Sequence, residues 1–263
     1  MISEIKNALR FFRISWEYNL INFIAYRIQS VFWVIYNTFL TITTFITISV
    51  VYYVSSGIAG WSYYDLMFLA ATMNISISIL GNLLNVGYLG TQLLKGGVDP
   101  YLVKPFGLAT LFLSIYGTPS QFAGIISGVI LAVYAGSHIH FTLASAAGYA
   151  ILMAIGTIAL ILFTLMVVVL AYVLIKGSFF VNKLLNFEQT LSKYPLHVYG
   201  LGGQLVFSLL IPIGFAYYYP TKVLLGSYNV YLFGLLCAVG IAIAVISYKS
   251  FYVLMRRYTS AGG

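Results

Sequence analysis

Apolar segments long enough to cross a lipid bilayer follow one another along almost the whole of this 263-residue chain. A helix needs about 20 predominantly apolar residues to span the hydrocarbon core. Hydrophobic residues make up 61% of the chain and charged residues only 7%, which is too much apolar surface for a water-soluble core. We therefore expect an all-α membrane protein with one domain over residues 1–263 and six transmembrane helices at residues 28–54, 64–88, 108–135, 143–174, 199–218 and 229–253.

Two segments depart from this simple pattern. The fifth expected span is short and contains Pro212, which predicts a kink or a partial re-entry into the membrane. Residues 2–20 are amphipathic rather than uniformly apolar, because their apolar side chains recur every three or four residues and most charges fall elsewhere around the helix. This pattern predicts a helix that lies on the membrane surface.

The positions of the cations predict the orientation of the chain. Loops rich in lysine and arginine stay on the cytoplasmic side of a membrane. With a cytoplasmic N-terminus, the six expected spans place every lysine and arginine on that side except Lys222. Both termini are then cytoplasmic. The net charge of +8 is scattered between apolar runs without exposed aromatic neighbours, so it does not indicate a nucleic-acid partner.

The stretch LLKGGVDPYLVKPFG, residues 93–107, collects turn residues and two lysines between apolar segments. Asp99 and Pro100 are typical of a helix start, whereas Pro105 disfavours helical geometry at Lys104. We expect about one turn of helix over residues 100–104, which displays Tyr101, Leu102 and Val103 to a soluble partner. An ordinary capped loop with its lysines at the lipid headgroups is the alternative, and the spacing leaves both open.

The same stretch resembles the cytoplasmic loop between the second and third spans of ABC-2 type transport permeases. That loop has the form Gly-x-(Leu/Val)-Asp-x-x-Leu-x-(Lys/Arg)-Pro, which falls here on Gly96, Val98, Asp99, Leu102, Lys104 and Pro105. Residues 194–226 and the ending RRYTSAGG are similar to the same family, so the resemblance covers essentially the full length.

The resemblance implies the permease subunit of an ATP-driven exporter in a prokaryotic plasma membrane. It implies two cytoplasmic ATPase subunits that bind ATP and Mg²⁺, and a second permease subunit, identical or different. This chain contains no Gly-x-x-x-x-Gly-Lys-(Ser/Thr) phosphate-binding loop, so we expect no cofactor on it and no catalysis by it. The expected ATPase-coupling loop consists of Gly96, Gly97, Val98, Asp99, Pro100, Tyr101, Leu102, Val103, Lys104 and Pro105.

Polar side chains recur at helical spacing within the apolar segments. Polar groups that face lipid are costly, so such a stripe is expected to face another helix or an aqueous path. Hydrogen bonds between helices explain it as well as a translocation path or a subunit interface does. The residues concerned are Asn74, Ser78, Asn82 and Asn85 in the second span, Asn37, Thr41 and Thr44 in the first, and Gln204 and Ser208 in the fifth.

Two other classes of protein remain as alternatives. A secondary transporter or channel would need no ATPase, but ion coupling requires carboxylates near the midplane, and all five carboxylates are expected near span ends or in loops. A membrane enzyme would need a clustered catalytic group or metal site. His138 and His140 are two potential metal ligands without an evident third, and His197 is expected on the opposite side of the membrane.

Overall fold

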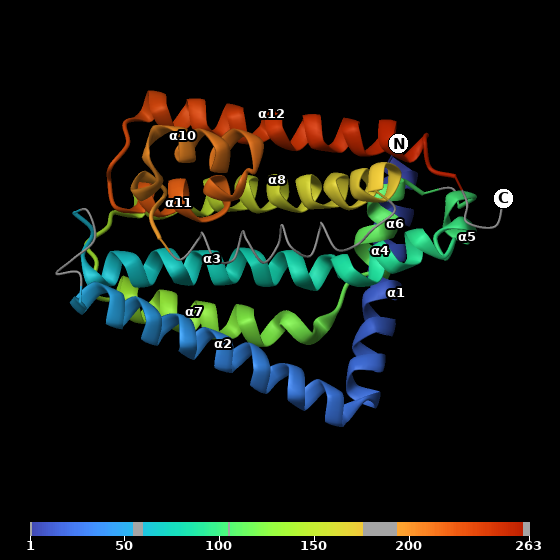
Figure 1. Cartoon of the computed structure of the whole chain (residues 1–263), viewed down its shortest axis with the longest axis horizontal. Helices are drawn as coiled ribbons and strands as arrows, with labels where there is room; N and C mark the ends of the chain where they lie inside the picture. Colours follow the sequence, from blue (N-terminus) through green and yellow to red (C-terminus); the bar gives the residue numbers. More distant parts are fainter. Residues whose placement is uncertain (1, 55–59, 105, 176–193, 260–263) are drawn as a thin grey trace.

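The computed structural model describes residues 2–54, 60–104, 106–175 and 194–259, and within these ranges every regular element is a helix (Figure 1). The elements are α1 (Ile2–Ala25), α2 (Arg27–Val54), α3 (Tyr63–Leu83), α4 (Val86–Leu94), α5 (Asp99–Leu102), α6 (Leu108–Ile115), η1 (Pro119–Gln121), α7 (Phe122–Gly136), α8 (Leu143–Ile175), η2 (Leu196–Tyr199), α10 (Gly200–Leu205), η3 (Val206–Leu210), α11 (Ile213–Leu224) and α12 (Val230–Met255).

The long helices lie side by side along the length of the molecule, and α1 runs crosswise at one end (Figure 1). The short helices α4, α5 and α6 lie at the same end as α1, which we call the α5 end. Trp61, just before α3, marks the opposite end, which we call the Trp61 end. Separate clusters of buried apolar side chains fill the two ends, with Leu89, Phe112 and Phe251 in one and Leu66 and Tyr217 in the other.

Five helices are long and apolar enough to cross a membrane, or six if one bent pair counts as a span. This confirms the all-helical membrane fold. Helices α2, α8 and α12 coincide within a few residues with the expected spans 28–54, 143–174 and 229–253. The expected span 64–88 is α3 continued, after a break at residues 84–85, by α4.

The expected span 108–135 is not one helix. Helix α6 ends at Ile115, and the helical chain resumes at Pro119, because Pro119 disfavours helical geometry at Thr118. This break crosses the break between α3 and α4: the Asn85 amide donates to the Tyr116 carbonyl (2.7 Å), and the Thr118 amide donates to the Asn82 carbonyl (2.9 Å). The two breaks therefore satisfy each other's backbone groups, as a buried backbone requires.

The expected span 199–218 is also wrong as a continuous helix. The segment from Leu196 to Leu210 meets α11 at an angle of 112°, and Pro212 lies at the bend. Both arms of this hairpin contact Trp61, since the His197 ring stacks on it (centroids 6.1 Å apart) and Lys222 Nζ lies 5.1 Å from its ring centroid. Both ends of this bent pair therefore lie at the Trp61 end, which is the geometry of the partial re-entry predicted from Pro212, and we call residues 196–224 the re-entrant hairpin.

This hairpin also corrects the expected position of His197. His197 lies at the Trp61 end, the same end as His138, whose ring stacks on Tyr64 at the start of α3 (centroids 4.0 Å apart). Helix α8, by contrast, finishes at the α5 end, where Tyr172 contacts Tyr258. The described chain thus leaves α8 at one end and resumes at Leu196 at the other.

The bend of the hairpin is held between α8 and α12. Phe215 is buried, and its backbone passes so close to Gly156 that a Cβ atom there would lie 2.8 Å from the Ala216 nitrogen and closer still to the Phe215 carbonyl. Its ring lies against Gly240 of α12, 3.4 Å from where a Cβ would stand. Glycine at position 156 is therefore what allows α11 to approach α8.

Candidate functional site

Glycines end the helix that precedes the candidate coupling loop. Gly96 has φ of +69°, a left-handed conformation that glycine adopts without strain, and the Gly97 amide donates to the Gln92 carbonyl (2.9 Å). This is the Schellman arrangement that commonly closes an α-helix. The Gln92 side chain occupies the place that a Cβ of Gly97 would need. The Gly-Gly pair thus turns the chain sharply out of α4 and into α5.

Helix α5 is one turn long and protrudes at the α5 end (Figure 1). It covers Asp99–Leu102 rather than residues 100–104, and the residue at its N-cap is Val98, not Asp99. Tyr101 is only partly exposed and its ring approaches Tyr116 edge-on (centroids 6.4 Å apart), so it is less available to a partner than expected. The exposed tip consists of Leu102, with 37% of its surface exposed, Val103, with 86%, and Lys104.

Contacts on two sides hold this tip. On one side, Lys104 Nζ lies 4.9 Å from the Tyr101 ring centroid and 5.6 Å from that of Phe11 in α1, and the Phe11 ring stacks on Phe106 (4.9 Å). On the other, the Tyr258 hydroxyl donates a hydrogen bond to Asp99 Oδ1 (2.8 Å). Burial, and then the bond to Asp99, raises the pKa of Tyr258, so this hydroxyl stays protonated at neutral pH.

Cations dominate the α5 end. The described lysines and arginines there include Arg10, Arg13, Lys95, Lys104, Lys249, Arg256 and Arg257, and Arg27 lies at the elbow between α1 and α2. The described carboxylates at this end already have partners: Glu17 pairs with Arg13 (2.8 Å), and Asp99 accepts from Tyr258. The surface around the tip of α5 is therefore positively charged.

The predicted polar stripe is a hydrogen-bonded seam between α2, α3 and α7. Asn74 Nδ2 donates to Thr41 Oγ1 (2.9 Å), and Thr41 Oγ1 lies 2.9 Å from Ser127 Oγ of α7. Asn37 Nδ2 donates to the Trp33 carbonyl (2.9 Å) and lies 3.4 Å from the Ser120 carbonyl. Three of the predicted residues, Asn37, Thr41 and Asn74, are thus brought together between helices.

Toward the C-terminal end of α3, the polar side chains of the stripe form hydrogen bonds mainly within that helix. Ser78 Oγ lies 3.5 Å from Asn74 Oδ1, and Asn82 Nδ2 donates to the Ser78 carbonyl (3.0 Å). Asn85 lies apart from the seam, since its side chain caps α4 by accepting from the Tyr88 amide (3.1 Å). Thr44 donates to the Leu40 carbonyl of its own helix (2.9 Å).

Gln204 and Ser208 belong to the re-entrant hairpin. Gln204 lies in α10, and Ser208 Oγ is 2.6 Å from the Tyr219 hydroxyl on the other arm. The two residues therefore lie in neighbouring elements of the hairpin, α10 and η3, and not in the seam between α2, α3 and α7.

Sequence reasoning missed a second buried polar cluster, which joins the hairpin to α3 and α8. Ser76 Oγ donates to the Ala216 carbonyl (2.8 Å), and Thr157 Oγ1 donates to Ser76 Oγ (3.1 Å). One turn earlier, Thr72 Oγ1 lies 3.1 Å from the Tyr149 hydroxyl. The four-residue spacing of Thr72 and Ser76 was the available signal, because it places both on one face of an apolar helix.

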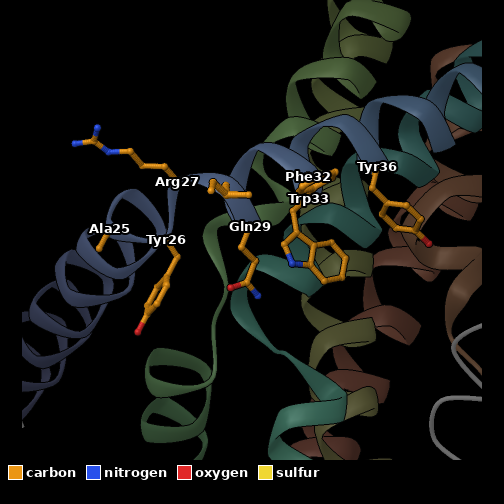
Figure 2. A pocket seen from close by; sticks show the side chains of 8 residues that line it. Ala25, Tyr26, Arg27, Gln29, Phe32, Trp33 and Tyr36 are labelled. Carbon is orange, nitrogen blue, oxygen red and sulfur yellow. The ribbon is translucent and has the colours of Figure 1, made fainter.

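An open hollow of about 990 Å³ lies at the elbow between α1 and α2. Figure 2 shows Tyr26, Gln29, Trp33 and Tyr36 on the same side of this segment, with the Arg27 side chain extending away from them. The hollow is mainly apolar and lies at the junction of the crosswise helix with a spanning helix. Its lining residues are Ala25, Tyr26, Arg27, Ile28, Gln29, Phe32, Trp33 and Tyr36.

The described residues form no group of three histidine, cysteine or carboxylate side chains that could hold a metal ion. His138 Nδ1 lies 3.0 Å from the Tyr134 carbonyl at the end of α7 and 3.1 Å from Ser137 Oγ, and His140 is exposed. Asp65 forms a capping box with Ser62 at the start of α3 (2.9 and 3.2 Å). Glu4 and Glu188 lie where side chains are outside the described part of the chain.

Comparison with known proteins identifies the family. The family model described as ABC-2 family transporter protein matches residues 38–262, which is most of the chain. No curated protein and no solved structure matches it. Proteins of this family are membrane transport components that associate with ABC ATPase subunits, and they are not themselves catalytic. With its long apolar helices and this match over α3, α7, α8 and α12, the chain belongs to the ABC-2 transporter family and is a multi-pass membrane permease of ABC type.

Proposed function

We propose that this permease forms half of the translocation path of an ATP-driven exporter and is coupled through α5 to a separate cytoplasmic ATPase. The observation that carries the proposal is the exposed tip of α5, where Leu102, Val103 and Lys104 project at one end of a membrane-spanning bundle. A compact apolar and basic tip suits a cleft in a soluble subunit, because a few well-packed residues carry most of the energy of an interface.

The distribution of charge supports an orientation with the α5 end in the cytoplasm. The cations gathered there exceed the carboxylates, whereas Lys222 lies at the Trp61 end against the Trp61 ring. In this orientation the elbow hollow lies at the cytoplasmic surface of the membrane. Tyr26, Trp33 and Tyr36 are there in the position that amphipathic aromatic side chains favour, with lipid as their neighbour.

A permease that forms half of a translocation path needs further subunits to complete the transporter. Two ATPase subunits supply ATP and Mg²⁺ binding, and a second permease subunit, identical or different, completes the path. The seam between α2, α3 and α7 and the polar residues of the hairpin are the candidate polar surfaces for that path. The described carboxylates are all engaged at helix ends or on the surface, which disfavours ion coupling in place of ATP.

A matched pair of charge substitutions tests the coupling role. Val103→Asp and Leu143→Asp each place a carboxylate at an almost fully exposed apolar position (86% and 89%), one on the α5 tip and one at the Trp61 end. The permease is purified in mild detergent from its native membrane, and a co-purifying ATPase is recognised by its phosphate-binding loop in mass spectra and by Mg²⁺-dependent ATP hydrolysis.

We expect Val103→Asp to weaken retention of the ATPase roughly 30-fold, the factor for an interface residue worth about 2 kcal/mol. Leu143→Asp should retain it like the unaltered protein. Equal retention by Val103→Asp and Leu143→Asp would contradict a docking role for α5.

A further inference from the structure

The chain beyond α12 folds back against α5. The Arg257 amide donates to the Leu254 carbonyl (2.9 Å) and the Tyr258 amide to the Met255 carbonyl (3.2 Å), so the helix closes in a tight turn. The turn carries residues 256–259 toward α4 and α5. We call these four residues the C-terminal strap.

Tyr258 of the strap contacts three other elements at once. Its hydroxyl donates to Asp99 Oδ1 of α5 (2.8 Å) and lies 3.5 Å from the Leu93 carbonyl of α4. Its ring packs against Tyr172 of α8 (centroids 5.2 Å apart), and the Tyr172 hydroxyl in turn donates to the Thr259 carbonyl (3.0 Å). The strap is therefore bound on both sides, to α5 and to α8, by residues that are 159 and 87 positions away in the sequence.

Helix α5 depends on such contacts for its orientation. A helix of four residues has too few internal hydrogen bonds to be stable alone, and none of the residues of α5 is buried. Its connections to the spanning helices α3 and α7 pass through the two crossed breaks at residues 84–85 and 116–118, so no continuous helix holds it in place. A bond to a charged acceptor is among the stronger single contacts available to it.

We propose that Tyr258 is a positioning residue, which fixes α5 to the ends of α8 and α12 and so presents the Val103 tip in one orientation. The role of Tyr258 in docking rests on the function proposed above, but its contact with α5 can be tested without any ATPase. The contact is a hydrogen bond between one hydroxyl and one carboxylate, so variants that remove each group alone and both together isolate the contribution of this bond.

The test uses a spin label at Val103→Cys in the full-length permease in lipid nanodiscs, on a Cys237→Ala background because Cys237 is the native cysteine. Tyr258→Phe keeps the ring on Tyr172 but removes the hydroxyl. Tyr248→Phe is the matched control, since it removes a tyrosine hydroxyl at the same end of the molecule that lies 3.4 Å from the Tyr252 hydroxyl, within α12. Electron paramagnetic resonance then reports the mobility of the label.

We expect Tyr258→Phe to cause loss of the immobilised component of the spectrum and Tyr248→Phe to leave it unchanged. Asp99→Asn, which keeps an acceptor for the hydroxyl, should retain the immobilised component, and Asp99→Ala should lose it. The double variant Tyr258→Phe with Asp99→Ala should be no more mobile than Asp99→Ala alone. A label that stays immobile in Tyr258→Phe, or that is freed equally by Tyr248→Phe, overturns the proposal.

Retention of the co-purified ATPase separates this inference from the proposed function. Loss of one hydrogen bond to a charged acceptor predicts about a tenfold weaker retention in Tyr258→Phe. If Val103→Asp weakens retention and Tyr258→Phe does not, α5 docks the ATPase but Tyr258 does not position it. If the label is freed by Tyr258→Phe while Val103→Asp has no effect on retention, the strap positions α5, and the docking role is the part that fails.

Discussion

Replacement of Gly156 by alanine tests the re-entrant hairpin most directly. Because the Cβ would overlap backbone atoms of Phe215 and Ala216, and not the end of a flexible side chain, α11 must move away from α8 to admit it. Overpacking of a tight interior typically costs about 1–3 kcal/mol, and a backbone clash belongs near the upper value. Alanine recovers about 1 kcal/mol through its better helix propensity. The net loss of stability is therefore about 2 kcal/mol.

The matched control is Gly234→Ala in α12, where a Cβ meets nothing within 4 Å. It should be as stable as the unaltered protein or slightly more stable. In thermal unfolding of the detergent-solubilised protein, a change of 1 kcal/mol shifts the midpoint by about 2–4 °C at this chain length, so Gly156→Ala should melt about 4–8 °C lower. If Gly156→Ala and Gly234→Ala melt at the same temperature, α11 does not pack against Gly156 and the chain does not form this hairpin.

Three further predictions address the seam, the start of α3 and the strap. Asn74→Ala removes the hydrogen-bond donor to Thr41 and should lower stability by about 0.6–1.7 kcal/mol, the range for hydrogen bonds between membrane helices. The same thermal unfolding measures this loss, and no change would mean that the seam contributes nothing to packing. Ser62→Ala removes the N-cap acceptor for the Asp65 amide and should cost about 1 kcal/mol, whereas Ser62→Asp should not. The pKa of Tyr258 is raised above its usual 10, so its hydrogen bond to Asp99 should persist at pH 10 and be lost only as the pH rises through the raised pKa. The spin label at position 103 reports this loss as an increase in mobility, and Tyr258→Phe should show no such transition.

Local sequence rules predict the parts of this fold that local forces determine. The spans α2, α8 and α12 are uninterrupted apolar runs, so their length alone identifies them. The Gly96-Gly97 pair predicts a helix end. Pro119 likewise indicates a helix break, which the prediction of a continuous span at residues 108–135 did not take into account. Family resemblance located the loop of α5, and the match over residues 38–262 confirms the family.

The remaining features depend on pairs of residues far apart in the chain. Hydropathy gives the length of an apolar segment but not its direction, so residues 199–218 were predicted as a span, although the two arms of the hairpin both contact Trp61. Ser76 and Ala216 are 140 positions apart, and Tyr258 and Asp99 are 159 apart. No periodicity within one segment indicates such a partner, and a single sequence shows only that each residue is polar or aromatic.

The positions of the breaks and contacts suggest how a movement of α5 would travel. The crossed breaks interrupt the helical connection from α5 to α3 and α7, so a displacement of α5 is not transmitted rigidly into those two spans. The Asp99–Tyr258 bond leads instead to α12 and, through Tyr172, to α8. These are the same two helices that hold Phe215 at the bend of the hairpin, through Gly156 and Gly240. An ATPase that moved α5 would therefore act on the hairpin at the far end through α8 and α12, and loosening of the strap would weaken that action without any change at the hairpin itself.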